Sequence, residues 1–116
     1  MLFTGELGFG FLEGIYTSAL AVELGHRGLA VVREAPIEVF YRGVLVGRYR
    51  LDMTVEDRVL VEAKATKTVS QADERQLLNY LKATNYEVGL LLHFGPTPGF
   101  RRLVYANQRK RNLPIR

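Results

Sequence analysis

The stretch RYRLDMTVEDRVLVEAKA, residues 48–65, decides the fold because it reads as two antiparallel strands joined by a tight loop. A three-residue loop at 56–58 sets apolar side chains opposite apolar side chains, whereas a two-residue loop would mix apolar and charged residues. Because a one-residue slip moves every side chain to the other face, the hydrophobic pattern selects the three-residue loop. The pairs predicted on the core face are Val55–Val59, Met53–Val61 and Leu51–Ala63.

The other face of this hairpin gathers charged residues. The same register sets Asp52 opposite Glu62 and Arg50 opposite Lys64, with directly opposed Cβ atoms roughly 4.5–5.5 Å apart. Two carboxylates at that spacing repel each other unless a cation lies between them, and oxygen donors suit Mg²⁺ or Mn²⁺. A lysine beside them could hold a water or offset charge on a phosphate. An exposed Glu–Lys ion pair is the alternative, and the hairpin alone favours that simpler interpretation.

The rest of the chain places this hairpin in an α/β fold. We expect a helix at about 11–25, an extended segment at 31–43, the two hairpin strands, a helix at 70–84, a strand at 86–94 and a short strand at 100–106. The second helix has Ser70 as a candidate N-cap with Asp73 three residues later. The order α-β-β-β-α-β predicts a mixed central sheet flanked by helices. Three consecutive strands argue against a doubly wound dinucleotide fold.

Composition and charge exclude several classes of protein. The chain has 116 residues, enough for one domain, and no cysteine, so disulfides and thiolate metal sites are excluded. Its apolar runs are far shorter than the roughly 20 residues of a membrane span, and no signal peptide is evident, so we expect a cytoplasmic protein without membrane or organic cofactor. We predict a domain at 1–106, with 12 basic and 12 acidic residues, and a basic, frayed tail at 107–116 that carries the net charge of +4.

Both predicted helices carry polar groups along mostly apolar faces. The first has Gly10, Glu13 and Tyr16, a G-x-x-E-x-x-Y spacing that forms one stripe along a helix. The second has Gln76 and Tyr80 on one face. Polar groups in such places need partners, which indicates that they take part in a site. The glycines near the N-terminus do not form a phosphate loop, because no strand precedes them and the G-x-G-x-x-G pattern is incomplete.

Four segments together resemble the GxxExxY protein family, a small branch of the PD-(D/E)xK nuclease superfamily. They are GFLEGIY (10–16), YRLDMTV (49–55), VLVEAKA (59–65) and RQLLNYLKAT (75–84). The resemblance extends from about Gly8 to Tyr105, with the motifs in the family's order and spacing, and it implies a restriction-endonuclease-like core. The family often has a histidine three residues before the glutamine, where this chain has Asp73.

The resemblance also implies roles for individual residues. Asp52 and Glu62 would ligate the metal, Lys64 would be the catalytic lysine, and Glu13 would be a further acid at the metal. We expect Tyr16, Gln76 and Tyr80 to support the site and the nucleic-acid strand.

The expected function is therefore Mg²⁺-dependent (or Mn²⁺-dependent) hydrolysis of DNA phosphodiester bonds. The alternative is a non-catalytic nucleic-acid-binding or accessory module in a DNA-processing or defence complex. Because a small domain with a neutral body has little surface for holding a duplex, we also expect a homodimer or a protein partner.

Overall fold

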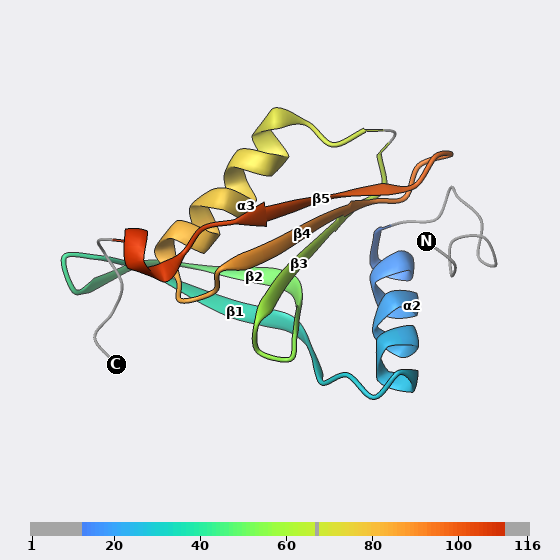
Figure 1. Cartoon of the computed structure of the whole chain (residues 1–116), viewed down its shortest axis with the longest axis horizontal. Helices are drawn as coiled ribbons and strands as arrows, with labels where there is room; N and C mark the ends of the chain where they lie inside the picture. Colours follow the sequence, from blue (N-terminus) through green and yellow to red (C-terminus); the bar gives the residue numbers. More distant parts are fainter. Residues whose placement is uncertain (1–12, 67, 111–116) are drawn as a thin grey trace.

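The chain forms a single mixed sheet with a helix on each side. The computed structural model describes residues 13–66 and 68–110. Its elements are α2 (Glu13–His26), β1 (Val31–Tyr41), β2 (Val44–Val55), β3 (Val59–Lys64), α3 (Gln71–Ala83), β4 (Val88–His93), β5 (Gly99–Val104) and the 3₁₀ helix η1 (Asn107–Arg109) (Figure 1). The order confirms the predicted α/β class, and β5 is the expected last strand. The predicted start of the first helix at 11 lies outside the described residues.

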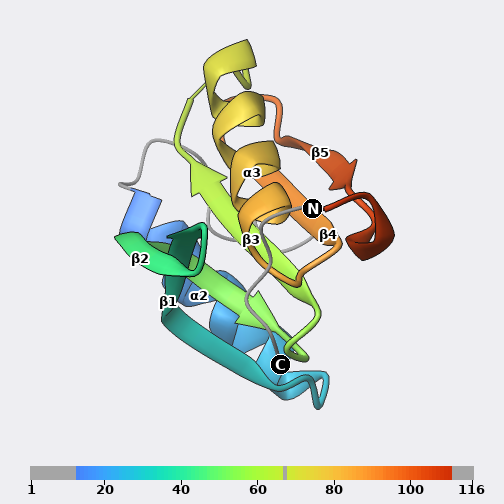
Figure 2. The ribbon, with the colours of Figure 1, turned by 90° about the vertical axis from the view of Figure 1, so that its left-hand side faces the viewer.

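The described strands lie in the order β1-β2-β3-β4-β5. All neighbours are antiparallel except β3 and β4, which are parallel and are connected through α3. A parallel pair needs a crossover connection of this kind, because a short turn can only reverse the chain. Figures 1 and 2 show α2 on one face of the sheet and α3 on the other. The carboxyl ends of β3 and β4 therefore meet at one edge, where ligand sites in such sheets commonly form.

Each helix buries its own apolar cluster against the sheet. The α2-side core contains Tyr16, Leu20, Met53, Val61, Ala63, Leu92 and Phe94. The α3-side core contains Ile37, Leu51, Leu60, Leu77, Leu81 and Leu91. Helix α3 begins with the predicted cap: Asp73 N donates to Ser70 Oγ at 3.0 Å, and Ser70 N donates to Asp73 Oδ2 at 3.3 Å. Because both faces of β3 and β4 are covered, those strands read as nearly continuous apolar runs.

In both β1 and β2, residues that a regular strand would place on one face of the sheet pack instead on opposite faces. Met53 lies in the α2-side core and Leu51 in the α3-side core, although a regular strand would keep both on one face. β1 does the same, because Val31 packs on the α2-side core and Ile37 lies in the α3-side core. The change in β1 coincides with Glu34, whose positive φ of 51° is uncommon for a residue other than glycine. The prediction that Leu51 and Met53 share a face is therefore wrong.

The β1–β2 hairpin ends in a two-residue turn. Tyr41 pairs with Val44, and both residues between them have positive φ, 50° at Arg42 and 78° at Gly43. Positive φ at both central residues defines a type I′ turn, whose twist matches that of the strands. Figure 1 shows this tip at the end of the molecule opposite α2.

The first residues of the predicted tail pack on the body of the protein. Lys110 Nζ donates to Thr84 O at 2.8 Å and to Tyr86 O at 2.6 Å, near the end of α3. Arg109 lies over the Tyr105 ring, 4.4 Å from its centroid. The prediction of a frayed tail is thus wrong for 107–110, while 111–116 lie outside the described residues. No helix within the described ranges is long and apolar enough to cross a membrane.

Candidate active site

The predicted acids and the lysine meet at the carboxyl end of β3. Lys64 is the last residue of β3, Glu62 lies two residues before it, and Asp52 lies on the neighbouring strand β2. Glu13 opens α2, and its Oε1 accepts a hydrogen bond from Ala65 N at 3.1 Å, which fixes the start of α2 beside the end of β3. One sheet edge thus brings together residues that are up to 51 positions apart in the chain.

Asp52 and Glu62 are held together through backbone amides. Asp52 N donates to Glu62 Oε1 at 2.9 Å, and Ala63 N donates to Asp52 Oδ2 at 2.6 Å. The predicted proximity of these two carboxylates is therefore confirmed. Each carboxylate accepts a hydrogen bond from a backbone N–H of the neighbouring strand. These bonds stand where backbone carbonyl groups would accept in a regular ladder. Both carboxylates are consequently fixed in position by the fold.

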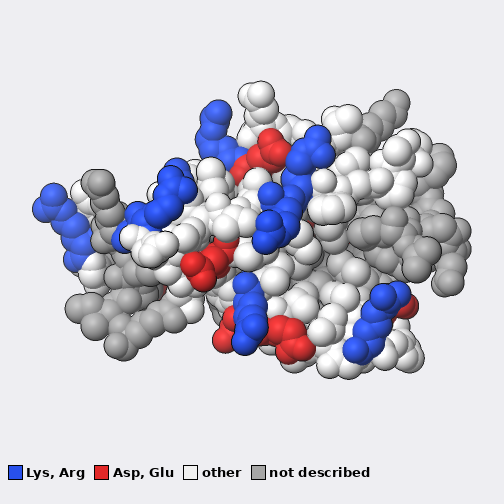
Figure 3. All heavy atoms as spheres, viewed as in Figure 1, with Lys and Arg blue, Asp and Glu red and all other residues white. Residues whose placement is uncertain are grey.

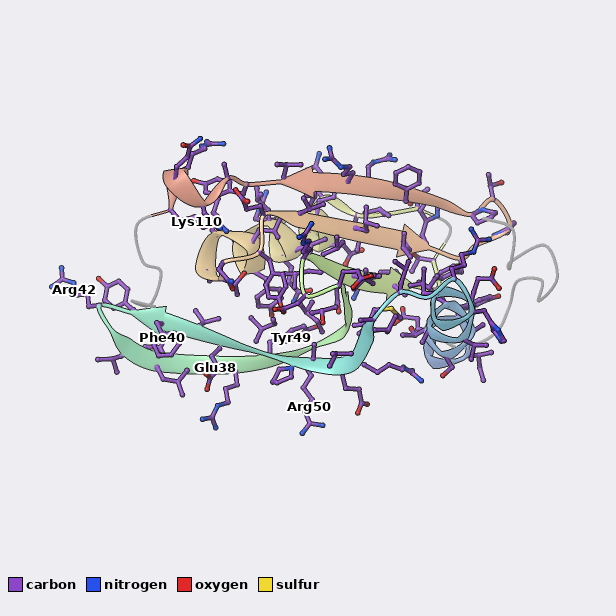
Figure 4. The ribbon with its side chains drawn as sticks, turned by 60° about the horizontal axis from the view of Figure 1, so that its bottom comes forward. Glu38, Phe40, Arg42, Tyr49, Arg50 and Lys110 are labelled. Atoms are coloured by element: carbon purple, nitrogen blue, oxygen red, sulfur yellow. The ribbon has the colours of Figure 1, made fainter. Side chains whose placement is uncertain are left out.

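The ladder between β2 and β3 ends just before this pair. The predicted pairs Val55–Val59 and Met53–Val61 are present, together with Thr54–Leu60. The predicted pairs Asp52–Glu62, Leu51–Ala63 and Arg50–Lys64 are not part of the ladder, and Asp52 and Glu62 meet through side-chain to backbone bonds instead. The physical reason is the change of face between Leu51 and Met53, which turns the preceding part of β2 toward α3. Figure 4 shows Arg50 pointing away from α3 and the rest of the molecule.

Burial raises the pKa of both carboxyl groups, so each is a weaker acid than usual. Glu62 is only 5% exposed. Burial, followed by the charge of Asp52, raises the pKa of Glu62 to about 7, against the opposing effects of Lys64 and of the hydrogen bonds from Asp52 N and Tyr49. Burial and the nearby charge of Glu13 also raise the pKa of Asp52. A cation placed beside both groups would relieve this cost of ionisation.

Glu62 has a further hydrogen-bond partner that the sequence analysis did not include. Tyr49 Oη donates to Glu62 Oε2 at 3.3 Å, and its ring stacks on the ring of Tyr80 with centroids 4.6 Å apart. Burial raises the pKa of Tyr49 to about 12, so the phenol remains a donor. Burial raises the pKa of Tyr80, and the polar side chain of Gln76 beside it acts in the opposite direction. Tyr80 of the predicted Gln76–Tyr80 pair is thus connected to Glu62 through Tyr49, on which it stacks.

Tyr16 is a packing residue of this site. It has no exposed surface, and its ring stacks on Phe94 with centroids 4.7 Å apart and planes 8° from parallel. Phe94 N in turn donates to Lys64 O at 2.9 Å. Tyr16 therefore fixes α2, which carries Glu13, against the end of β3. A fully buried ring does not contact a nucleic acid, so any supporting role is indirect.

The donor set fits a hard divalent cation that keeps several waters. Asp52 and Glu62 provide only oxygen donors, and Mg²⁺ is commonly held by one or two carboxylates plus water. Within residues 13–66 and 68–110, no group of three or more His, Cys, Asp and Glu side chains is arranged to hold a metal. Glu13 is bonded to Ala65 N and does not complete such a group. The fit therefore rests on the Asp52–Glu62 pair.

The raised pKa of Glu62 predicts how the stability of the metal-free protein depends on pH. The folded state holds this proton up to about pH 7, whereas the ordinary value is 4.5, so ionisation is less favourable in the folded state. The free energy of unfolding should accordingly fall as pH rises from about 4.5 to about 7 and then level off. Urea unfolding in the presence of a chelator measures this, and Glu62→Gln should remove most of the slope. An equal slope in Glu62→Gln would contradict the assignment.

Fold and site together define a nuclease-like α/β protein, in which a D…E-x-K set lies at the end of a mixed sheet. A family model described as the PD-(D/E)XK nuclease superfamily matches residues 2–103, and the chain belongs to that superfamily. The fold is consistent with the restriction-endonuclease-like architecture, as predicted. Neither the comparison with curated proteins nor that with solved structures found a significant match.

Proposed function

We propose that this protein is a divalent-metal-dependent phosphodiesterase that cleaves DNA. The observation that carries the proposal is the pair formed by half-buried Asp52 and buried Glu62, which reciprocal backbone hydrogen bonds hold in place. Lys64 follows Glu62 by two residues on the same strand. Membership of the nuclease superfamily supports it, because nucleases of that superfamily typically use divalent metals. The proposal includes the GxxExxY branch, which is supported by the spacing of Gly10, Glu13 and Tyr16.

Asp52 and Glu62 would hold the ion, and Glu13 would join them by leaving Ala65 N. When bound, Mg²⁺ or Mn²⁺ would supply Lewis-acid polarisation of a phosphate oxygen and a more acidic water. Lys64 lies near both carboxylates, since its charge lowers the pKa of each. Its ammonium group would position the attacking water or offset the charge that develops on the phosphate.

Tyr49 and Tyr80 would keep Glu62 oriented. Since Tyr49 Oη donates to Oε2 and Asp52 N donates to Oε1, the Glu62 carboxylate cannot rotate without losing a bond. Stacking on Tyr80 fixes the Tyr49 ring in turn. Preorganised groups of this kind cost little reorganisation during the reaction.

One observation favours the alternative, a non-catalytic nucleic-acid-binding or accessory module. Protein donors already bond both oxygens of Glu62 and one oxygen of Asp52, so the pair could serve to hold the strands together. Under that alternative the charges of Asp52 and Lys64 would matter little to the role of the protein.

Cleavage assays separate the two functions. The purified protein would be incubated with plasmid DNA and with labelled single-stranded DNA in Mg²⁺, in Mn²⁺ and in excess chelator. We expect cleavage with either metal and none with chelator. Binding of DNA without cleavage under every metal condition would favour the accessory module over the nuclease.

A further inference from the structure

Two hollows adjoin along α3, one on the surface of the helix and one between α3 and the β1–β2 hairpin. The first, about 350 Å³, is lined by Ala72, Arg75, Gln76, Asn79 and Tyr80 of α3. The second, about 490 Å³, is lined by Val39, Phe40, Tyr41 and Val46 of the hairpin and by Asn79, Lys82 and Ala83 of α3. Because Asn79 lines both, the two hollows are neighbours, and together we call them the α3–hairpin groove. From Ala72 to Ala83 it follows α3 for about 16 Å.

The lining of the α3–hairpin groove combines cations, amides and aromatic rings. Arg75 and Lys82 provide positive charge, and no Asp or Glu is among the lining residues of either hollow. None of the ion pairs between described residues involves Arg75 or Lys82, although Lys82 lies over the Tyr105 ring, 5.4 Å from its centroid. A groove with unneutralised cations is complementary to an anion.

One aromatic side chain at the hairpin end of the groove is open to solvent. Tyr41 is 55% exposed, and the guanidinium carbon of Arg42 lies 5.6 Å from its ring centroid. Figure 4 shows Arg42 at the far end of the hairpin, with Phe40 on the strand leading to it. An exposed ring beside a cation is the kind of platform on which nucleic-acid bases stack.

The other end of the α3–hairpin groove reaches the candidate active site. Tyr80 lines the first hollow, stacks on Tyr49, and Tyr49 donates to Glu62. A nucleic-acid strand that lies in the groove and contacts Tyr80 would therefore be connected to Glu62 through one further side chain, that of Tyr49. This continuity relates the groove to the proposed chemistry.

We infer that the α3–hairpin groove binds single-stranded DNA and leads it to the Asp52–Glu62 pair. This inference rests on the proposed function and names its substrate form. Hollows of a few hundred Å³ have room for one or a few nucleotides, and exposed rings beside cations favour unpaired bases, whose faces are free to stack. On the face shown in Figure 3, basic side chains are interspersed with acidic ones, whereas duplex binding relies on many cations along the backbone.

The experiment measures binding without catalysis. A fluorescein-labelled oligothymidine of about 12 nucleotides, within the usual site size of single-strand-binding proteins, is titrated with wild-type protein in chelator, and anisotropy is recorded. We expect tighter binding of this strand than of a duplex of the same length. Tyr41→Ala should weaken it about tenfold through lost stacking. Arg75→Ala should weaken it severalfold and reduce the salt slope by about 0.7.

Matched controls lie on β5, outside the groove. Phe100, which is 57% exposed, and Arg102 resemble Tyr41 and Arg75 in exposure and chemistry. Phe100→Ala and Arg102→Ala should bind the oligonucleotide like the wild type. All four variants change exposed side chains, and circular dichroism with size-exclusion chromatography checks their fold and oligomeric state.

Equal losses in the groove and control variants would overturn the inference, as would duplex binding as tight as single-strand binding. A change of oligomeric state in Tyr41→Ala, with single-strand affinity unchanged, would instead identify the hairpin as a contact between copies and would also overturn it. Binding in chelator does not depend on cleavage, so groove binding without cleavage would refute only the proposed catalysis. Cleavage that survives Tyr41→Ala and Arg75→Ala with unaltered binding would refute only the groove.

Discussion

Asp52→Asn and Lys64→Ala should each reduce metal-dependent DNA cleavage by a factor on the order of 100 to 1,000. Asp52→Asn keeps the shape of the side chain and an acceptor for Ala63 N, but it removes the negative charge that would attract the cation. Lys64→Ala removes the positive charge that lowers the pKa of both carboxylates. Initial rates on labelled DNA with saturating Mg²⁺ measure both effects.

Two surface variants serve as controls for these rates. Glu38→Gln changes an exposed carboxylate whose partner is Arg48, with 3.2 Å between Glu38 Oε2 and Arg48 Nε. Arg58→Ala removes an exposed cation from the β2–β3 loop. Both should cleave DNA like the wild type. Activity that persists in both Asp52→Asn and Lys64→Ala would refute the assignment of the site.

Glu62→Gln should stabilise the metal-free protein while abolishing cleavage. At about pH 8 the buried Glu62 is ionised despite a pKa near 7, and the neutral amide avoids this cost. The amide oxygen can still accept from Asp52 N, which donates to Oε1 at 2.9 Å. We expect the free energy of unfolding to rise by roughly 1–3 kcal/mol, as measured by urea unfolding in chelator.

The pH dependence distinguishes this effect from a general gain in packing. Below about pH 4.5 Glu62 is protonated in both folded and unfolded states, so wild type and Glu62→Gln should converge in stability. Glu38→Gln, at an exposed position, should stay within about 0.5 kcal/mol of the wild type throughout. A lower unfolding free energy for Glu62→Gln at high pH would mean that the hydrogen bonds of the carboxylate outweigh its desolvation.

The order of elements and the proximity of Asp52 and Glu62 were predictable from the sequence. Alternating apolar residues determined the loop at 56–58, and the loop determined which residues lie across from each other. Ser70 and Asp73 likewise marked the start of α3, because that spacing satisfies backbone donors at the start of a helix. These features depend on short-range patterns, which a single sequence contains.

The role of Tyr49 was not predictable in the same way. In a regular strand Tyr49 and Asp52, three residues apart, would point to opposite faces. The change of face between Leu51 and Met53 breaks that rule, and it coincides with the positive φ of Glu34 on the neighbouring strand. β2 contains no proline, and its glycine, Gly47, lies four residues before Leu51, so neither residue type marks this change in the sequence. A strained residue beside a candidate site is a feature that tertiary contacts must maintain.

The packing of residues 107–110 was missed for a related reason. Their charge suggested a solvated end, but Lys110 Nζ satisfies carbonyl oxygens near the end of α3, at Thr84 and Tyr86. Helix carboxyl ends leave such acceptors unpaired, and a distant lysine can supply the donor. Which lysine does so depends on the three-dimensional path of the chain and not on local sequence.

A titration with Mn²⁺ tests the central claim, that the Asp52–Glu62 pair is a divalent-cation site, most directly. Binding would be followed by electron paramagnetic resonance of free Mn²⁺ in wild type, Asp52→Asn and the Glu38→Gln control, each shown to be folded. We predict saturable binding by wild type and Glu38→Gln and loss of most of that binding in Asp52→Asn. Equal Mn²⁺ binding by wild type and Asp52→Asn, or none by wild type, would contradict the account.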